Sequence, residues 1–125
     1  MSKPLEGKVA VITGSGRRAG LGEAIARRLA SDGAKIVLSD LGTSRDSATG
    51  EEHIGTSDEM EGIAAELRQL GVEVSTCPCD VRSLDEVRAL AAHAEAEHGG
   101  IDIWVNNAGI GYIMKPLLDV TEADW

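Results

Sequence analysis

A glycine-rich segment, residues 14–22, separates two apolar patterns of different period. Before it, residues 9–12 read Val-Ala-Val-Ile, a continuous run typical of a strand buried on both faces of a parallel sheet. After it, apolar residues recur at helical spacing from Leu21 to Leu29, and Gly33 follows as a helix stop. A strand, a glycine-rich turn and a helix in this order predict the first unit of an α/β fold.

The same alternation continues along the chain. Further strands are predicted at residues 36–38, 72–79 and 101–105, and helices at about 58–70 and 84–98. The helices open on two capping-box spacings, Thr56 with Glu59 and Ser83 with Glu86. Their inward stripes are listed as Met60, Ile63, Ala64, Leu67 and Leu70 for the first, and Leu84, Val87, Leu90, Ala91 and Ala94 for the second.

Four strands joined by crossover helices predict a doubly wound parallel sheet, with strand order 3-2-1-4. The segment 41–57 is polar and is expected to form a long loop, and residues 121–124 are expected to open a further helix. The chain of 125 residues has room for a single domain, and no second domain is predicted.

Composition excludes several classes of function. Aromatic residues make up only 2% of the chain and its net charge is −9, which argues against nucleic-acid binding and against anionic membranes. No apolar run approaches the ~18 residues that span a bilayer, and the first residues lack the apolar core of a signal peptide. A cytoplasmic location is therefore expected, with Cys77 and Cys79 as reduced thiols.

The glycine segment suits a phosphate. Glycines let the backbone approach a pyrophosphate closely, and the N-terminus of the following helix offers free N–H groups and partial positive charge. Asp40 ends the second strand 18 residues after Gly22, where a carboxylate accepts hydrogen bonds from an adenosine ribose. A plain strand-to-helix turn also favours glycine, but strand, helix and Asp40 together favour dinucleotide binding.

Three motifs resemble those of the short-chain dehydrogenase/reductase family. The family loop Thr-Gly-x-x-x-Gly-x-Gly is matched by Thr13-Gly14, five residues and Gly20-Leu21-Gly22, so this loop is two residues longer. The Asp-Val that follows the third strand of the family corresponds to Asp80-Val81. The family motif Asn-Asn-Ala-Gly corresponds in full to residues 106–109. The chain thus resembles the N-terminal, cofactor-binding half of a Rossmann-type dehydrogenase domain over residues 1–125.

The resemblance implies a set of cofactor-binding residues. By this resemblance, Asp80 would hydrogen-bond the adenine, while Asn107 and Ala108 would border the cofactor ribose. The expected set is Gly14, Arg18, Gly20, Leu21, Gly22, Asp40, Asp80, Val81, Asn107 and Ala108. Asp40 favours the free 2′-hydroxyl of NAD and repels the 2′-phosphate of NADP, whereas Arg17 and Arg18 are able to attract that phosphate. NAD is the favoured cofactor, with NADP as the alternative.

The resemblance also implies what is missing. The catalytic Ser and Tyr-x-x-x-Lys of the family lie beyond this half, and Tyr112 with Lys115 has i+3 spacing followed by Pro116. No catalytic residue is therefore assigned in this chain. The implied function is hydride transfer between a nicotinamide cofactor and an alcohol or carbonyl substrate. It is completed by a C-terminal half, in the same chain or as a separate fragment, in a homo-oligomer. The alternative is a truncated, non-catalytic dinucleotide-binding or interaction module.

Two other groups of residues contain side chains that often bind metals or take part in catalysis. Cys77-Pro78-Cys79 lacks a second pair of ligands at zinc spacing, so no metal site is predicted and buried thiols are expected. His93 and Glu97 lie one helical turn apart, and a solvated helix face is expected for them. The fourth strand is apolar and carries no charge that would blunt pairing at a sheet edge, which predicts a further strand beside it.

Overall fold

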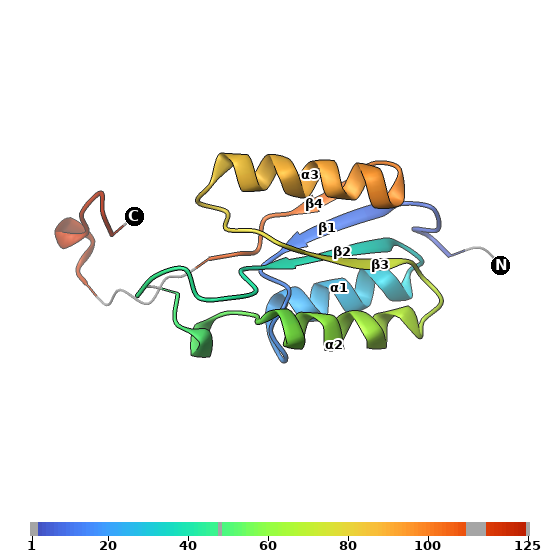
Figure 1. Ribbon diagram of the computed structural model, residues 1–125, viewed down its shortest axis with the longest axis horizontal. Coiled ribbons are helices and arrows are strands. Elements are labelled where there is room, and N and C mark those ends of the chain that lie inside the picture. Colours follow the sequence, from blue (N-terminus) through green and yellow to red (C-terminus); the bar gives the residue numbers. More distant parts are fainter. Residues whose placement is uncertain (1–2, 48, 110–114, 125) are drawn as a thin grey trace.

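The computed structural model describes residues 3–47, 49–109 and 115–124 and contains one parallel sheet. Its strands are β1 (Val9–Thr13), β2 (Lys35–Asp40), β3 (Val74–Pro78) and β4 (Ile103–Val105). They lie in the order β3-β2-β1-β4, and β1 pairs in parallel with both β2 and β4 (Figure 1). The doubly wound fold with strand order 3-2-1-4 is confirmed.

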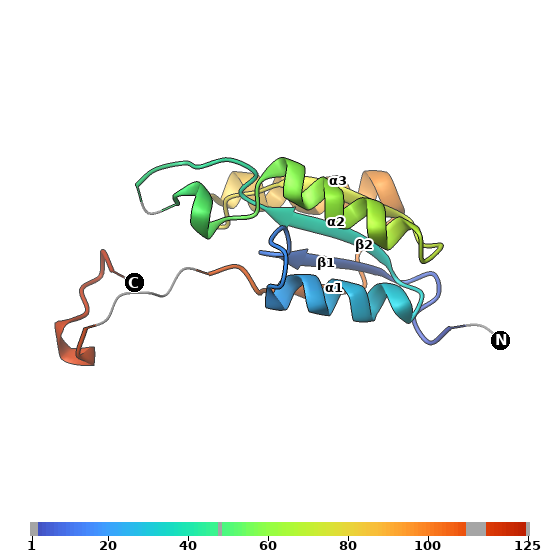
Figure 2. The same ribbon diagram turned by 90° about the horizontal axis from the view of Figure 1, so that it is seen from below.

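Three α-helices cover the two faces of this sheet. Helices α1 (Leu21–Ser31) and α2 (Ser57–Arg68) lie on one face, and α3 (Leu84–His98) lies on the other (Figures 1 and 2). Two short 3-10 helices, η1 (Glu51–His53) and η2 (Leu117–Asp119), lie outside these layers. None of the helices in the described ranges is both long and apolar enough to cross a bilayer.

Alternate strand residues feed two apolar layers. Ile12, Ile36 and Leu38 pack toward α1 and α2, while Val11 and Val37 pack toward α3. Side chains of consecutive strand residues point to opposite faces, so strands buried on both sides need continuous apolar runs. The apolar runs of β1 and β2 meet this need. Because the two strands are parallel and paired, their carboxyl ends lie side by side at one edge of the sheet.

The amino end of α3 differs from the expectation. Leu84 was expected to point inward, but 61% of it is exposed, and the buried side chains of α3 are Leu90 and Ala94. Figure 1 shows the first turn of α3 projecting beyond the carboxyl ends of the strands, where the sheet offers nothing to cover a leucine. Helical spacing alone does not reveal where the underlying sheet stops.

The solvated face predicted for His93 and Glu97 is found at Glu97, which is exposed, but not at His93. His93 is half-buried, and its Nε2 lies 2.9 Å from Ser75 Oγ on β3. His98 Nε2 lies 2.8 Å from the same hydroxyl, and its side chain is only 4% exposed. The two histidines thus join α3 to the edge strand of the sheet.

Residues 121–124, which are expected to open a further helix, form a turn that carries the hydrogen bonds of a helix start. Thr121 N–H donates to Asp124 Oδ2 at 3.0 Å, and Asp124 N–H donates to Thr121 Oγ1 at 3.2 Å. These reciprocal bonds are those of a capping box, but within residues 115–124 they close a turn and the regular element is η2. Tyr112, weighed above together with Lys115, lies outside the described residues.

Candidate functional site

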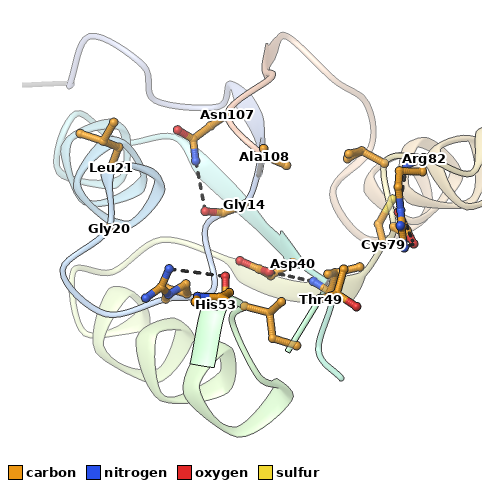
Figure 3. A pocket seen from close by; sticks show the side chains of 16 residues that line it. Gly14, Gly20, Leu21, Asp40, Thr49, His53, Cys79, Arg82, Asn107 and Ala108 are labelled. Atoms are coloured by element: carbon orange, nitrogen blue, oxygen red, sulfur yellow. Dashed lines mark hydrogen bonds and ion pairs between the residues drawn. The ribbon is translucent and has the colours of Figure 1, made fainter. Parts of the chain in front are cut away.

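A pocket of about 300 Å³ lies at the carboxyl ends of the strands (Figure 3). Open α/β sheets place ligands at this edge, where loops leave toward opposite faces. The pocket is lined by the glycine loop, the end of β2, the segment 41–56, the turn after β3 and the segment after β4. Its lining residues are Gly14, Arg17, Gly20, Leu21, Asp40, Leu41, Thr49, His53, Ile54, Cys79, Asp80, Val81, Arg82, Asn107, Ala108 and Gly109.

Two glycines of the loop are required by backbone packing. Gly14 has φ +67°, and a Cβ on it would lie 2.7 Å from Ala108 Cα. A Cβ on Gly22 would lie 2.5 Å from Gly14 O, and Gly22 does not itself line the pocket. Asn107 secures the junction because its Nδ2 donates to Gly14 O at 3.1 Å (Figure 3) and to Thr13 O at 3.2 Å.

Gly20 is different because nothing in the protein requires a glycine there. A Cβ on Gly20 would meet Arg17 O at 3.4 Å, an ordinary contact, and its φ of −88° suits any residue. Gly20 is the N-cap of α1 and lines the pocket. The first N–H groups of a helix have no acceptor inside the helix, so this end of α1 offers donors and partial positive charge to an anion.

The two arginines of the loop do not have equivalent places. Arg17 lines the pocket, and its Nη1 donates to His53 O at 3.4 Å. The Arg18 guanidinium forms ion pairs with Glu66 and Glu23, and Arg18 does not line the pocket. Hydrogen bonding to Glu66 raises the pKa of Arg18. Arg18, expected among the cofactor-binding residues, anchors the loop to α1 and α2 in this structure.

Asp40 lines the pocket at the end of β2 and also organises its walls. Its Oδ2 accepts the Gly16 N–H at 3.0 Å, and its Oδ1 accepts the N–H groups of Leu41 at 2.8 Å and Gly55 at 3.0 Å. A Cβ on Gly55 would lie 2.4 Å from the carbonyl carbon of Gly16. The carboxylate therefore joins the glycine loop to the segment 41–56 and still brings its negative charge to the pocket wall.

Asp80 lines the pocket from the turn between β3 and α3. Its side chain is 12% exposed, and Arg82 Nη2 lies 2.7 Å from its Oδ2. Hydrogen bonding to Arg82 lowers the pKa of Asp80, so the carboxylate stays ionised. The neighbouring Val81 is 45% exposed and presents an apolar surface to the pocket.

The segment 41–56 supplies a wall that the sequence motifs did not identify. Its ends meet in a bridge between Gly42 and Thr56, and η1 lies within it. Thr49, 2% exposed, accepts the N–H groups of Arg45 and Asp46 on its Oγ1 at 2.8 and 2.9 Å. Its pocket residues are Leu41, Thr49, His53 and Ile54. Only the length and polarity of the segment pointed to a functional loop.

The described residues contain no cluster of three or more His, Cys, Asp or Glu side chains suited to a metal ion. Cys77 and Cys79 are both free thiols. Cys79 is buried in the pocket wall, and burial raises its pKa to about 11. Burial also raises the pKa of Cys77. Neutral thiols are poor nucleophiles. Cys79 is buried as expected, whereas Cys77 is only half-buried.

The sequence matches the family described as short chain dehydrogenase over residues 8–125. It is 39% identical over 107 residues to the 7alpha-hydroxysteroid dehydrogenase of Escherichia coli strain K12, which covers 86% of this chain and 36% of that protein. It is 37% identical over 123 residues to dehydrogenase/reductase SDR family member 4 of Sus scrofa, with coverages of 98% and 38%. This chain therefore spans less than half the length of these curated relatives.

Solved structures give the same result. A hydroxysteroid dehydrogenase from Escherichia coli superposes with a TM-score of 0.71 at 37% identity, over 93% of this chain and 44% of that one. A metagenomic short-chain oxidoreductase in complex with NADP gives 0.72 at 36% identity, over 97% and 48%. The sheet order, the pocket at the strand ends and these matches lead to one conclusion: the chain belongs to the short-chain dehydrogenase/reductase family.

Proposed function

We propose that this chain is the dinucleotide-binding part of an NAD-dependent oxidoreductase that interconverts a small alcohol and its carbonyl compound. A nicotinamide cofactor, when bound, supplies the hydride chemistry, and the protein supplies binding and orientation. The observation that carries the proposal is the pocket between Gly20 at the amino end of α1 and Asp40 at the end of β2. One side suits a pyrophosphate and the other suits a ribose diol.

The preference for NAD rests on the charges around the pocket. Asp40 accepts three N–H groups, yet two carboxylate oxygens offer about four acceptor positions, so one remains for a ribose hydroxyl. Its charge disfavours a 2′-phosphate nearby. Arg18, a candidate partner for that phosphate, is engaged by Glu23 and Glu66. Two observations favour NADP instead: Arg17 lines the pocket, and the metagenomic relative was solved in complex with NADP.

The residues of this chain have binding roles in the proposal. The first turn of α1, reached past Gly20, holds the pyrophosphate, and Asp40 holds the adenosine ribose. Asp80 and Val81 border the adenine, while Asn107 and Ala108, next to Gly14, border the path toward the nicotinamide end. Gly22 and Arg18 do not line the pocket. Gly22 allows the close backbone packing of the glycine loop, and Arg18 anchors that loop to α1 and α2.

The remaining parts of the proposal concern the whole protein. No catalytic residue is assigned in this chain, so the Ser, Tyr and Lys of the family come from a C-terminal half, in the same chain or as a separate fragment. We further propose a cytoplasmic homo-oligomer. A non-catalytic dinucleotide-binding module is the competing function, and it predicts cofactor binding without turnover of any carbonyl compound.

Calorimetric titration of the full-length protein with NAD and NADP tests the cofactor assignment. Asp40→Asn removes the charge and keeps one acceptor oxygen, so NAD should bind roughly tenfold more weakly, as for a lost hydrogen bond to a charged group, and the preference for NAD over NADP should shrink. Asp32→Asn, at the C-cap of α1, makes the same charge change away from the pocket lining and serves as the control. An unchanged ratio of the two affinities in Asp40→Asn contradicts the assignment.

A further inference from the structure

Two consecutive residues of the segment 41–56 form ion pairs with the amino end of α3. Arg45 Nη1 lies 3.1 Å from Glu86 Oε2, and Asp46 Oδ2 lies 2.9 Å from Arg82 Nη1. The two pairs have opposite polarity, so each side presents one cation and one anion. This arrangement fixes which residue meets which, because a shift by one position would bring like charges together.

Both partners of the segment also hold Asp80. Arg82 binds the carboxylate with a fork, Nη2 to Oδ2 at 2.7 Å and Nε to Oδ1 at 3.0 Å (Figure 3). Glu86 Oε1 accepts the Asp80 N–H at 3.0 Å. Asp80 is thus held at its side chain and at its backbone by the two residues that bind the segment 41–56.

The pocket lies between the segment 41–56 and the turn after β3, which these ion pairs join. Thr49 and Ile54 line it from the segment 41–56, and Asp80 and Val81 line it from the turn after β3. Ile54 and Val81 are apolar, and Asp80 is an ionised acceptor at the same end. An apolar slot with an acceptor at its edge suits a flat purine that carries an amino group.

We propose that Arg82 is a positioning residue that couples the segment 41–56 to Asp80, and that the closed segment forms the wall against which the adenosine half of a dinucleotide binds. This inference rests on the proposed function. Arg82 places one guanidinium between two carboxylates, those of Asp46 and Asp80. Without this guanidinium the two carboxylates repel each other, the segment moves outward, and Asp80 loses its fixed orientation.

The strength of the coupling comes from the network. Isolated surface ion pairs contribute little, but a bidentate arginine fork shared by two carboxylates is geometrically specific. The Asp80 carboxylate, 12% exposed, is the least solvated member, so its contact with Arg82 is the least screened by salt. Removal of Arg82 should therefore be felt at Asp80 more than at the exposed Asp46.

The test compares the two halves of the cofactor as separate ligands of the full-length protein. Adenosine and nicotinamide mononucleotide are titrated, with binding followed by ligand-observed NMR. In Arg82→Gln the affinity for adenosine should fall roughly tenfold, the order of coupling seen between contacting residues, while the affinity for the mononucleotide stays unchanged. Arg28→Gln is the matched control because it removes the same charge from an ion pair on α1 outside the pocket.

Two further variants separate coupling from a general loss of structure. Arg82→Gln combined with Asp46→Asn should regain part of the adenosine affinity, because one of the repelling carboxylates becomes neutral. Arg82→Lys keeps the charge without the fork and should lie between the wild type and Arg82→Gln.

The outcomes are distinguishable. Unchanged adenosine affinity in Arg82→Gln, or equal losses for both ligands, overturns the inference and leaves the proposed function standing. A wild-type protein that binds neither adenosine, nicotinamide mononucleotide nor NAD overturns the proposed function and this inference together. Selective loss of adenosine affinity in Arg82→Gln and partial recovery in the double variant support the inference.

Discussion

The glycines of the loop meet two physical needs, which differ from residue to residue. Gly14 and Gly22 are where backbone approaches backbone, as their hypothetical Cβ contacts of 2.7 and 2.5 Å show. The protein itself would leave room for a side chain at Gly20. Because Gly20 lines the pocket, the missing side chain leaves space for a ligand there. Stability and binding are therefore separable within nine residues of sequence.

Gly20→Val should abolish dinucleotide binding and keep the fold. The extended backbone of the N-cap accepts a β-branched residue, and the added carbons project at the rim where a pyrophosphate needs close approach.

Gly22→Ala should instead destabilise the protein by about 1–3 kcal/mol, because its Cβ meets backbone atoms that have little room to move. Urea unfolding followed by circular dichroism, with NAD titration alongside, distinguishes the two variants. Wild-type affinity in Gly20→Val would show that Gly20 is only a turn residue.

The Cys79 thiol should resist alkylation in the folded protein. Its pKa of about 11 leaves almost no thiolate at pH 7.5, and its side chain is buried. Mass spectrometry after iodoacetamide treatment should find Cys79 unmodified until denaturant is added. A bound cofactor should not change this result, and rapid modification of the native protein would contradict the burial of the thiol.

The sequence predicts the position of a pocket residue well where that residue ends a strand. It predicts less well the contacts between residues of loops that are far apart in the sequence. Asp40 ends a strand, so its place at the pocket followed from the sequence. Its bond to the Gly55 N–H did not, because it depends on the path of the chain between Asp40 and Gly55, which are fifteen positions apart. Arg82 follows Asp80 at a spacing that allows a fork, yet nothing local signals that Asp46, thirty-six residues earlier, meets the same guanidinium.

At the scale of elements, α3 is attached to β3 by the Ser75 hydroxyl and two imidazoles. His98 Nδ1 is buried without a hydrogen-bond partner in the described residues, and Glu73 Oε1 lies 3.7 Å from it. A proton on Nδ1, facing this carboxylate, leaves His98 Nε2 as acceptor for the Ser75 hydroxyl, which in turn accepts from His93. The arrangement needs neutral His98.

This requirement predicts a loss of stability in mild acid. Burial lowers the pKa of His98 despite the opposing effect of Glu73, so the unfolded chain takes up the proton at a higher pH than the folded chain. The free energy of unfolding should therefore fall as the pH drops below the unfolded value of about 6.5. His98→Gln should flatten this slope between about pH 7 and pH 5, measured by urea titrations at several pH values. His53→Gln, outside α3, should keep the slope, and an identical slope in both variants contradicts the assignment to His98.

Helix starts were well predicted because their signals are local. Thr56 Oγ1 accepts the Glu59 N–H at 3.2 Å, and Ser83 Oγ accepts the Glu86 N–H at 3.3 Å, as the capping-box spacing indicated. The Glu86 carboxylate nonetheless binds the Asp80 N–H and Arg45. A capping motif thus predicts where a helix begins better than it predicts where its second side chain points.

At the scale of the molecule, the sheet has two unlike edges. In the described residues β3 pairs only with β2 and β4 pairs only with β1, and β4 is a strand of three half-buried apolar residues. Its outer edge carries no charge, although two carboxamides, Asn106 and Asn107, follow it. An uncharged apolar edge pairs readily with another strand. The sequence indicated this edge but not which segment covers it.

Residues 1–125 expressed alone should self-associate and show no dehydrogenase activity. The exposed edge of β4 favours intermolecular pairing, and no catalytic Tyr or Lys is assigned in this segment. Light scattering across a range of concentrations, with NADH oxidation assayed against a panel of carbonyl compounds, measures both properties. Adding the C-terminal half proposed above, in the same chain or as a second one, should restore monodisperse behaviour and turnover. A monodisperse monomer that is active, and loses activity in Tyr112→Phe, would contradict the prediction.

The bridge that joins the ends of the segment 41–56 has a consequence for how such proteins diversify. Gly42 N–H donates to Gly55 O at 2.9 Å and Ser57 N–H donates to Gly42 O at 2.9 Å, so the segment leaves and re-enters the fold at one point. Lengthening a loop whose ends are pinned costs little entropy. We therefore expect that the segment between Gly42 and Gly55 can be shortened or extended without displacing β2 or α2, and that each such change alters the same side of the pocket.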